Sequence, residues 1–177
     1  MKQERTKKIA LSALFCALTF AMTWISVPAP AVGNVNLGDG ALLLCAHILG
    51  GPWAAIAAAT GAALTDLMSA YAIYAPGTFV IKACMVIVAL AMTNLLTRCK
   101  LPTLAARLIS ALCAEITMIA GYLIYEAWIL SYGFPTAILN VPFNAVQGAI
   151  AVALFAVVYP VLGKTGLLRW LEQGRNA

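Results

Sequence analysis

The stretch Thr65-Asp-Leu-Met-Ser-Ala-Tyr-Ala-Ile-Tyr-Ala-Pro-Gly-Thr-Phe-Val-Ile-Lys82 decides the fold, because it places one acidic and one basic residue among apolar segments. Asp66 and Lys82 both lie within the apolar run Ala54–Leu96 and bracket two tyrosines and a Pro-Gly pair. A charge in hydrocarbon costs roughly 2.5 kcal/mol or more, so a charged residue inside a membrane segment indicates a functional site. We therefore expect the chain to hold something polar here.

The composition of the chain indicates an integral membrane protein. Of the 177 residues, 63% are hydrophobic and 10% are charged, and the mean hydropathy is +0.94. Soluble domains carry about 25% charged residues. Six apolar runs separated by Pro or Gly predict an all-α integral membrane protein with six transmembrane helices in a single membrane domain, residues 1–177. The expected helices are approximately 9–27, 39–49, 53–69, 78–97, 104–126 and 141–162.

The second predicted helix is unusually short. A spanning helix needs about 20 residues, whereas the ten or so residues of this run extend over roughly 15 Å. It cannot cross a bilayer alone unless it extends or the bilayer thins. Asp39 is expected to cap its start, because a carboxylate accepts hydrogen bonds from the free N–H groups of the first turn.

The positions of the basic residues predict the orientation. Ten of the eleven Lys and Arg residues precede the first helix, lie between the fourth and fifth, or follow the sixth. With six crossings these places share one side of the membrane, so the positive-inside rule puts both termini in the cytoplasm. The net charge of +5 then reflects this asymmetry and contact with anionic membrane lipid, and it does not indicate nucleic acid as a partner.

The N-terminus permits a second interpretation. Basic residues, an apolar stretch and Ala29-Pro30-Ala31 also resemble a secretory signal peptide with its cleavage site. The apolar segment Ile9–Val27 is longer than the usual core of about 7–15 residues, so we expect an uncleaved helix.

The sequence contains no pattern for catalysis or for a metal. The five cysteines form no C-x-x-C pair, and His47 is the only histidine, so we expect it to be a hydrogen-bonded packing residue. There is no nucleotide-binding loop, no H-E-x-x-H and no nucleophile with a base. We therefore expect no catalytic residue, metal or cofactor. Any uphill transport must draw its energy from an ion gradient or from another polypeptide.

Polar side chains gather in the predicted outer halves of the last four helices. Asn140, Asn144 and Gln147 recur at i, i+4 and i+7, which places them on one helical face. Tyr122 and Glu126 lie at the outer end of the helix before them. The inner halves are mainly apolar, so the pattern predicts a cup open to the outside and not a channel.

Each of these features has a purely structural alternative. Asp66 and Lys82 could neutralise each other as a buried pair. The three amide side chains could form hydrogen bonds between helices, and each tyrosine could be an anchor at the membrane–water interface.

Small residues form stripes on two helices. Such stripes let helix backbones approach closely. We expect the stripe on the third helix to be buried within the protein, whereas the stripe on the first helix could face a separate membrane partner or pack internally. The residues are Ala13, Ala17 and Ala21 on the first helix, and Ala54, Ala58 and Ala62, with Ala57, Gly61 and Thr65 beside them, on the third.

Three segments give the chain a resemblance to a known family. Ala13-x-x-x-Ala17, Val35-Asn-Leu-Gly-Asp39 and the stretch Thr65–Lys82 resemble the substrate-binding S component of energy-coupling factor (ECF) transporters, in the riboflavin-transporter-like group. The resemblance extends over essentially the whole chain in length and in its six-helix layout.

The resemblance implies a protein of the bacterial plasma membrane that captures a vitamin or vitamin precursor from outside. It implies association with a transmembrane coupling subunit and two cytoplasmic ATPases. The coupling subunit would contact the alanines of the first helix, Ala13, Ala17 and Ala21, and the first outer loop, about Pro28–Gly38, would cover the site. The expected substrate-binding residues are Asn36, Asp66, Tyr71, Tyr74, Lys82, Tyr122, Glu126, Asn140, Asn144 and Gln147.

The substrate class is less defined. Members of this group take flavins, vitamin B6 forms, pyrimidine precursors of thiamin or modified-nucleoside precursors. Tyrosines for stacking, amides for ring heteroatoms, and Asp66 or Glu126 for an amine favour a B6-type or pyrimidine-type ligand. A self-contained secondary transporter and a structural or assembly membrane protein are the alternative functions.

Overall fold

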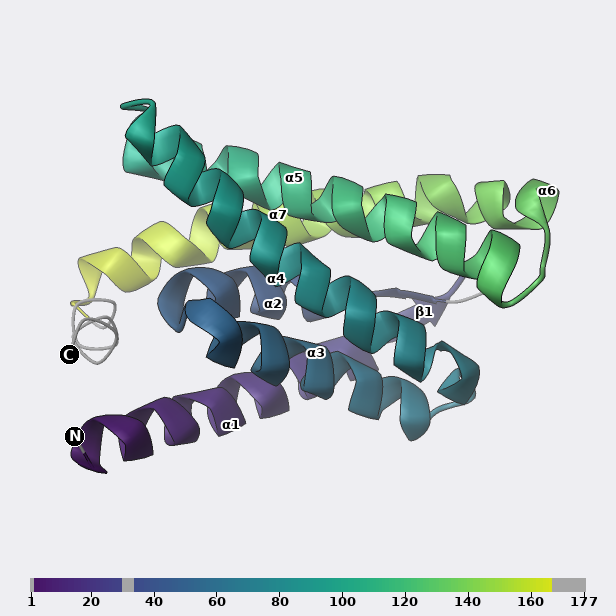
Figure 1. Cartoon of the computed structure of the whole chain (residues 1–177), viewed down its shortest axis with the longest axis horizontal. Helices are drawn as coiled ribbons and strands as arrows, with labels where there is room; N and C mark the ends of the chain where they lie inside the picture. Colours follow the sequence, from purple (N-terminus) through teal and green to yellow (C-terminus); the bar gives the residue numbers. More distant parts are fainter. Residues whose placement is uncertain (1, 30–33, 167–177) are drawn as a thin grey trace.

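The computed structural model describes residues 2–29 and 34–166 as a bundle of helices that run along its long axis (Figure 1). Six helices in this part of the chain have eleven residues or more. They are α1 (Lys2–Trp24), α2 (Gly38–Ile48), α3 (Gly51–Leu67), α4 (Ala75–Arg98), α5 (Thr103–Ile124) and α7 (Val141–Lys164). Shorter turns are η1 (Ala72–Tyr74), the π-helical η2 (Tyr125–Ile129), α6 (Phe134–Ala137) and η3 (Ile138–Asn140). The predicted helical class is confirmed.

Proline fixes where several helices begin. α3, α4 and α7 each carry a proline in their first turn, at Pro52, Pro76 and Pro142. A proline at this position lacks an N–H that would have no partner anyway, and its fixed φ suits the helix. Pro76-Gly77, which looks like a break in the sequence, is therefore the start of α4.

Within the part of the chain that the structure describes, four segments are long and apolar enough to cross a membrane. They are Arg5–Trp24, Ala72–Arg98, Thr103–Ile129 and Phe134–Lys164. α3 has 17 residues and α2 has 11, so the six crossings remain a prediction. All residues of α2 except Leu44 are buried. Because α2 is surrounded by protein, it does not have to match the thickness of the lipid.

A short hairpin departs from the predicted all-α class. β1 (Ser26–Pro28) pairs antiparallel with β2 (Asn34–Asn36), with Val27 opposite Val35. An isolated two-stranded hairpin is marginal, but Asn36 N donates a hydrogen bond of 2.8 Å to Gln147 Oε1 on α7. Pro30 and Ala31 of the alternative cleavage site lie outside the described residues.

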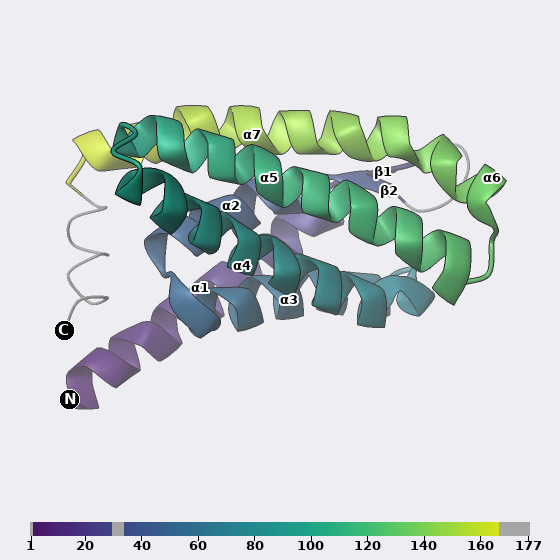
Figure 2. The same cartoon turned by 45° about the horizontal axis from the view of Figure 1, so that its top comes forward.

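The helices form layers that Figure 2 separates. α5 and α7 run side by side along one face, α1 and α3 lie along the opposite face, and α2 and α4 lie between them. α1 and α3 approach so closely that a Cβ on Gly61 would lie 2.3 Å from the Cys16 carbonyl oxygen. Thr65 Oγ1 also donates to Phe20 O at 3.1 Å. The predicted internal packing of the α3 stripe is confirmed.

α1 presents two different faces. Leu11, Phe15, Thr19 and Thr23 are buried against the bundle. The alanine stripe, Ala13, Ala17 and Ala21, is exposed on the other side. These alanines therefore do not pack within the protein.

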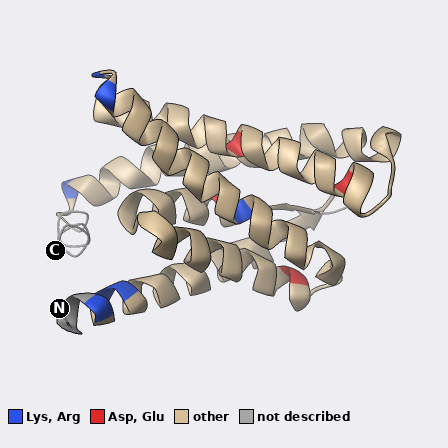
Figure 3. Ribbon diagram, viewed as in Figure 1, with Lys and Arg blue, Asp and Glu red and all other residues tan. Residues whose placement is uncertain are grey.

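The basic residues gather at one end of the bundle. Figure 3 shows Lys and Arg at the start of α1, at the turn between α4 and α5 and at the end of α7, with one more in the middle of the bundle. This common end is the arrangement that the predicted topology requires.

The same end holds a buried polar cluster that the apolar pattern did not predict. His47 Nε2 lies 3.2 Å from Thr93 Oγ1 and 3.3 Å from Ser110 Oγ. Arg107 donates a hydrogen bond to the Tyr159 hydroxyl. The expectation that His47 is a hydrogen-bonded packing residue is confirmed.

Candidate ligand pocket

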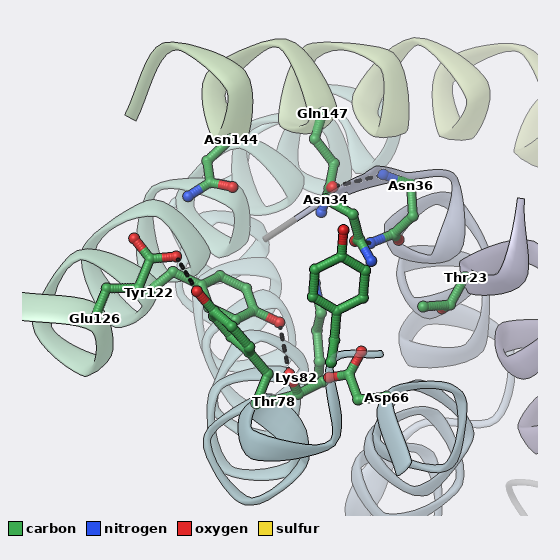
Figure 4. Close-up of a pocket in the computed structure, with 12 residues that line it drawn as sticks. Thr23, Asn34, Asn36, Asp66, Thr78, Lys82, Tyr122, Glu126, Asn144 and Gln147 are labelled. Atoms are coloured by element: carbon green, nitrogen blue, oxygen red, sulfur yellow. Dashed lines mark hydrogen bonds between the residues drawn. The ribbon is translucent and has the colours of Figure 1, made fainter. Parts of the chain in front are cut away.

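A pocket opens at the end of the bundle away from the basic residues. It encloses about 460 Å³, counting its open mouth, and its walls come from the hairpin and from the ends of α1, α3, α4, α5 and α7 (Figure 4). The lining residues are Thr23, Asn34, Asn36, Asp66, Tyr71, Tyr74, Thr78, Lys82, Tyr122, Glu126, Asn144 and Gln147.

Nine of the ten residues expected to bind a substrate line this pocket. The exception is Asn140, whose Nδ2 donates to Glu126 Oε2 at 2.9 Å. Asn140 ends the 3₁₀ turn η3 and is not part of α7, so the helical spacing that grouped it with Asn144 does not apply. It positions a pocket residue from outside.

Three lining residues, Thr23, Asn34 and Thr78, were not predicted. Thr78 lies one helical turn before Lys82, and Asn34 lies two residues before Asn36 on the same face of β2. These two spacings were a usable signal. Thr23 had no such signal in the sequence, because it lies at the end of an apolar run without a polar residue at helical spacing that was assigned to the site.

Lys82 forms its ion pair with Asp39, so the alternative in which Lys82 and Asp66 neutralise each other as a buried pair is wrong. Both partners are buried. Asp39 is also not the cap of α2, whose capping position is Leu37, without a side-chain hydrogen bond. The second Asp39 oxygen, Oδ2, accepts a hydrogen bond of 2.6 Å from Gln147 Nε2. A buried charge pair needs such additional hydrogen bonds to satisfy its remaining atoms.

This network joins four elements behind the pocket. Lys82 comes from α4, Asp39 from α2 and Gln147 from α7, and Gln147 Oε1 accepts from the β2 backbone at Asn36. Both ends of the Gln147 amide are therefore occupied by protein. Asn144, one turn earlier on α7, forms no hydrogen bond with a described residue, and its amide is available to a ligand (Figure 4).

The other side of the pocket is aromatic and acidic. Tyr74 OH donates to Glu126 Oε1 at 3.3 Å, and the hydroxyls of Tyr122 and Thr78 lie 3.0 Å apart. The Tyr74 ring centroid is 6.2 Å from that of Tyr71 and 6.4 Å from that of Tyr122, within the usual range for contacting aromatic pairs. These tyrosines line a cavity and do not act only as anchors in lipid.

The turn η2 sets the position of Glu126. In this π-helical turn Leu130 N bonds to Tyr125 O, and Tyr125 OH donates to Ile73 O at 2.9 Å. A Cβ on Gly77 would lie 2.5 Å from the Tyr125 ring, so only glycine fits there. π-helical turns are frequent at functional sites.

The fold and the pocket define a helical membrane protein built to hold a small polar molecule at one end. The family model described as "ECF-type riboflavin transporter, S component" matches residues 3–164. The chain belongs to this family, whose members are substrate-binding membrane proteins that associate with the membrane and ATPase modules of ECF transporters.

A solved structure supports the fold. The S component of a bacterial ECF transporter superposes with a TM-score of 0.73 at 19% sequence identity, over 91% of this chain and 98% of that one. No curated protein matches the chain.

Proposed function

We propose that this S component captures a small heteroaromatic vitamin or vitamin precursor, of the vitamin B6 or pyrimidine type, from outside a bacterial plasma membrane. A transmembrane coupling subunit and two cytoplasmic ATPases then move the substrate inward. The observation that carries the proposal is the polar pocket at the end of the bundle opposite the basic residues. By the positive-inside rule that end faces outward.

The lining chemistry favours a ring with heteroatoms. Tyr71, Tyr74 and Tyr122 offer apolar faces with polar tips, and the Asn144 amide offers both donors and an acceptor. These groups suit a compact ring with heteroatoms, of the B6 or pyrimidine type.

The exposed alanine stripe on α1 supports the proposed coupling. A flat strip on α1 is formed by Ala13, Ala17 and Ala21. Beside this strip lie Leu14 and Leu18, which are 61% and 39% exposed. Small residues let another helix approach closely. We propose this strip as the contact with the coupling subunit.

Native mass spectrometry of the purified protein tests the proposal. We expect a retained small molecule with the mass of a B6-type or pyrimidine-type compound, and co-purification with two ATPases from cells that express the whole transporter. Retention of riboflavin would refute the substrate class. Proton- or sodium-driven flux by the isolated chain would favour a secondary transporter instead.

A further inference from the structure

The charges around the pocket do not balance. Among the four ionisable side chains Asp39, Asp66, Lys82 and Glu126, the single cation is bound to Asp39. Asp66 and Glu126 line the cavity, and neither has a cationic partner within 4 Å in residues 2–29 and 34–166. Glu115, which interacts electrostatically with Asp39 and Lys82, is also acidic and adds no positive charge. The pocket lining therefore holds two carboxyl groups, Asp66 and Glu126, that have no cation in contact with them among the described residues.

The two carboxylates differ in what they already bind. Glu126 accepts hydrogen bonds from Tyr74 and Asn140, one on each oxygen. Asp66 is 7% exposed, and its carboxylate interacts with one side-chain donor, the Thr78 hydroxyl. A carboxylate has about four acceptor positions, so Asp66 keeps most of its capacity free. In Figure 4 the Asp66 and Glu126 side chains lie on opposite sides of the cavity.

The position of Asp66 in its helix adds to this negative charge. Asp66 lies in the last turn of α3, which contains no basic residue. The C-terminal end of a helix carries a partial negative charge that favours a cation and disfavours a carboxylate. Lys82 is paired with Asp39, whose other oxygen accepts a hydrogen bond from Gln147, and moving Lys82 to Asp66 would strand the buried Asp39 charge. Lys82 acts on Asp66 electrostatically but is not within ion-pair distance of it, so a cationic ligand would supply the direct partner that Asp66 lacks among the described residues.

We infer that the substrate presents a basic nitrogen, as an amine or an amino-substituted ring, and that the Asp66 carboxylate binds its N–H groups as an ion pair. This inference rests on the proposed function and narrows it. A neutral compound such as riboflavin offers the buried Asp66 carboxylate no opposite charge, and a buried charge without one is costly. The tyrosine faces beside Asp66 also suit a ligand that carries positive charge.

Two matched ligand pairs test the inference by titration calorimetry on the purified full chain. Pyridoxamine carries an amine where pyridoxine carries a hydroxyl. 4-Amino-5-hydroxymethyl-2-methylpyrimidine likewise carries an amino group where its 4-oxo analogue carries an oxygen. In the pair that binds, we expect the amino compound to bind roughly 10- to 100-fold more tightly, as a charge-assisted hydrogen bond implies. Equal or tighter binding of the oxygen analogue would overturn the inference and leave the proposed function intact.

Two variants then locate the contact. Asp66→Asn keeps the shape and should reduce the preference for the amino compound to about threefold or less, since the charge has gone. The matched control, Glu115→Gln, removes a buried carboxyl that does not line the pocket and should keep the preference. An unchanged preference in Asp66→Asn would overturn the assignment to Asp66. Failure of all four compounds to bind the wild-type chain would refute the proposed substrate class and the inference with it.

Discussion

The buried network behind the pocket gives the sharpest prediction for stability. Asp39 is 0% and Lys82 2% exposed, and Asp39 uses one oxygen for Lys82 and the other for Gln147. Asp39→Asn keeps an oxygen for Gln147 but turns an NH₂ group toward the ammonium of Lys82. Removing one partner of a buried pair costs about 3–5 kcal/mol. For a chain of this length that corresponds to a loss of roughly 6–20 °C in melting temperature.

Thermal unfolding of the detergent-purified protein, followed by tryptophan fluorescence, measures this loss. Asp66→Asn is the matched control, because Asp66 lines the same pocket but is not the partner of Lys82. We expect it to change the melting temperature much less. The double variant Asp39→Asn/Lys82→Met should recover most of the loss, since it removes the stranded charge. Equal destabilisation by Asp66→Asn, or no recovery in the double variant, would refute the assigned pairing.

Three further predictions follow from the packing and from the charge pattern. Ala13→Trp and Ala17→Trp should abolish uptake by the whole transporter while ligand binding by the isolated chain is unchanged. The control Ala153→Trp, at an exposed alanine of α7, should leave uptake intact. Loss of ligand binding in the α1 variants would mean that these alanines support the pocket. In thermal unfolding, Gly61→Ala should destabilise the protein by about 1–3 kcal/mol through overpacking. Gly40→Ala, whose Cβ would meet the Leu154 side chain at 3.2 Å, should destabilise it less. The reverse order would contradict the close approach of α1 and α3. Reporter fusions at Gln3 and Ala177 should both report the cytoplasm, and an external C-terminus would reject six crossings.

The partner of Lys82 shows where sequence reasoning reaches its limit. Asp66 was the plausible partner because both charges bracket one short segment, but the actual partner, Asp39, lies 43 residues before Lys82 on another helix. A capping role for Asp39 was the local interpretation of its position before an apolar run. Only the packing of α2 inside the bundle brings Asp39 next to α4, and no spacing in the sequence encodes that contact.

Periodic features were more predictable than irregular ones. The apolar runs and their Pro and Gly boundaries indicated six helices, and the spacing of Asn144 and Gln147 placed both on the pocket side of α7. The hairpin was not predicted, because its strands have three residues each and show no usable alternation. Asn140 was misplaced because the chain forms a 3₁₀ turn before α7, where the 3.6-residue period fails.

Retention of the ligand by paired variants tests the central claim, that the pocket between α3, α4, α5 and α7 holds the substrate. Native mass spectrometry should find the small molecule on the wild-type protein and on Ala153→Leu, which changes an exposed surface. Asn144→Leu removes an amide that is available to the ligand and should weaken the binding free energy by about 1–3 kcal/mol. We expect this loss of affinity to release the molecule during purification while the protein remains monodisperse. Full retention by Asn144→Leu and by Tyr122→Leu would contradict the account and put the substrate elsewhere.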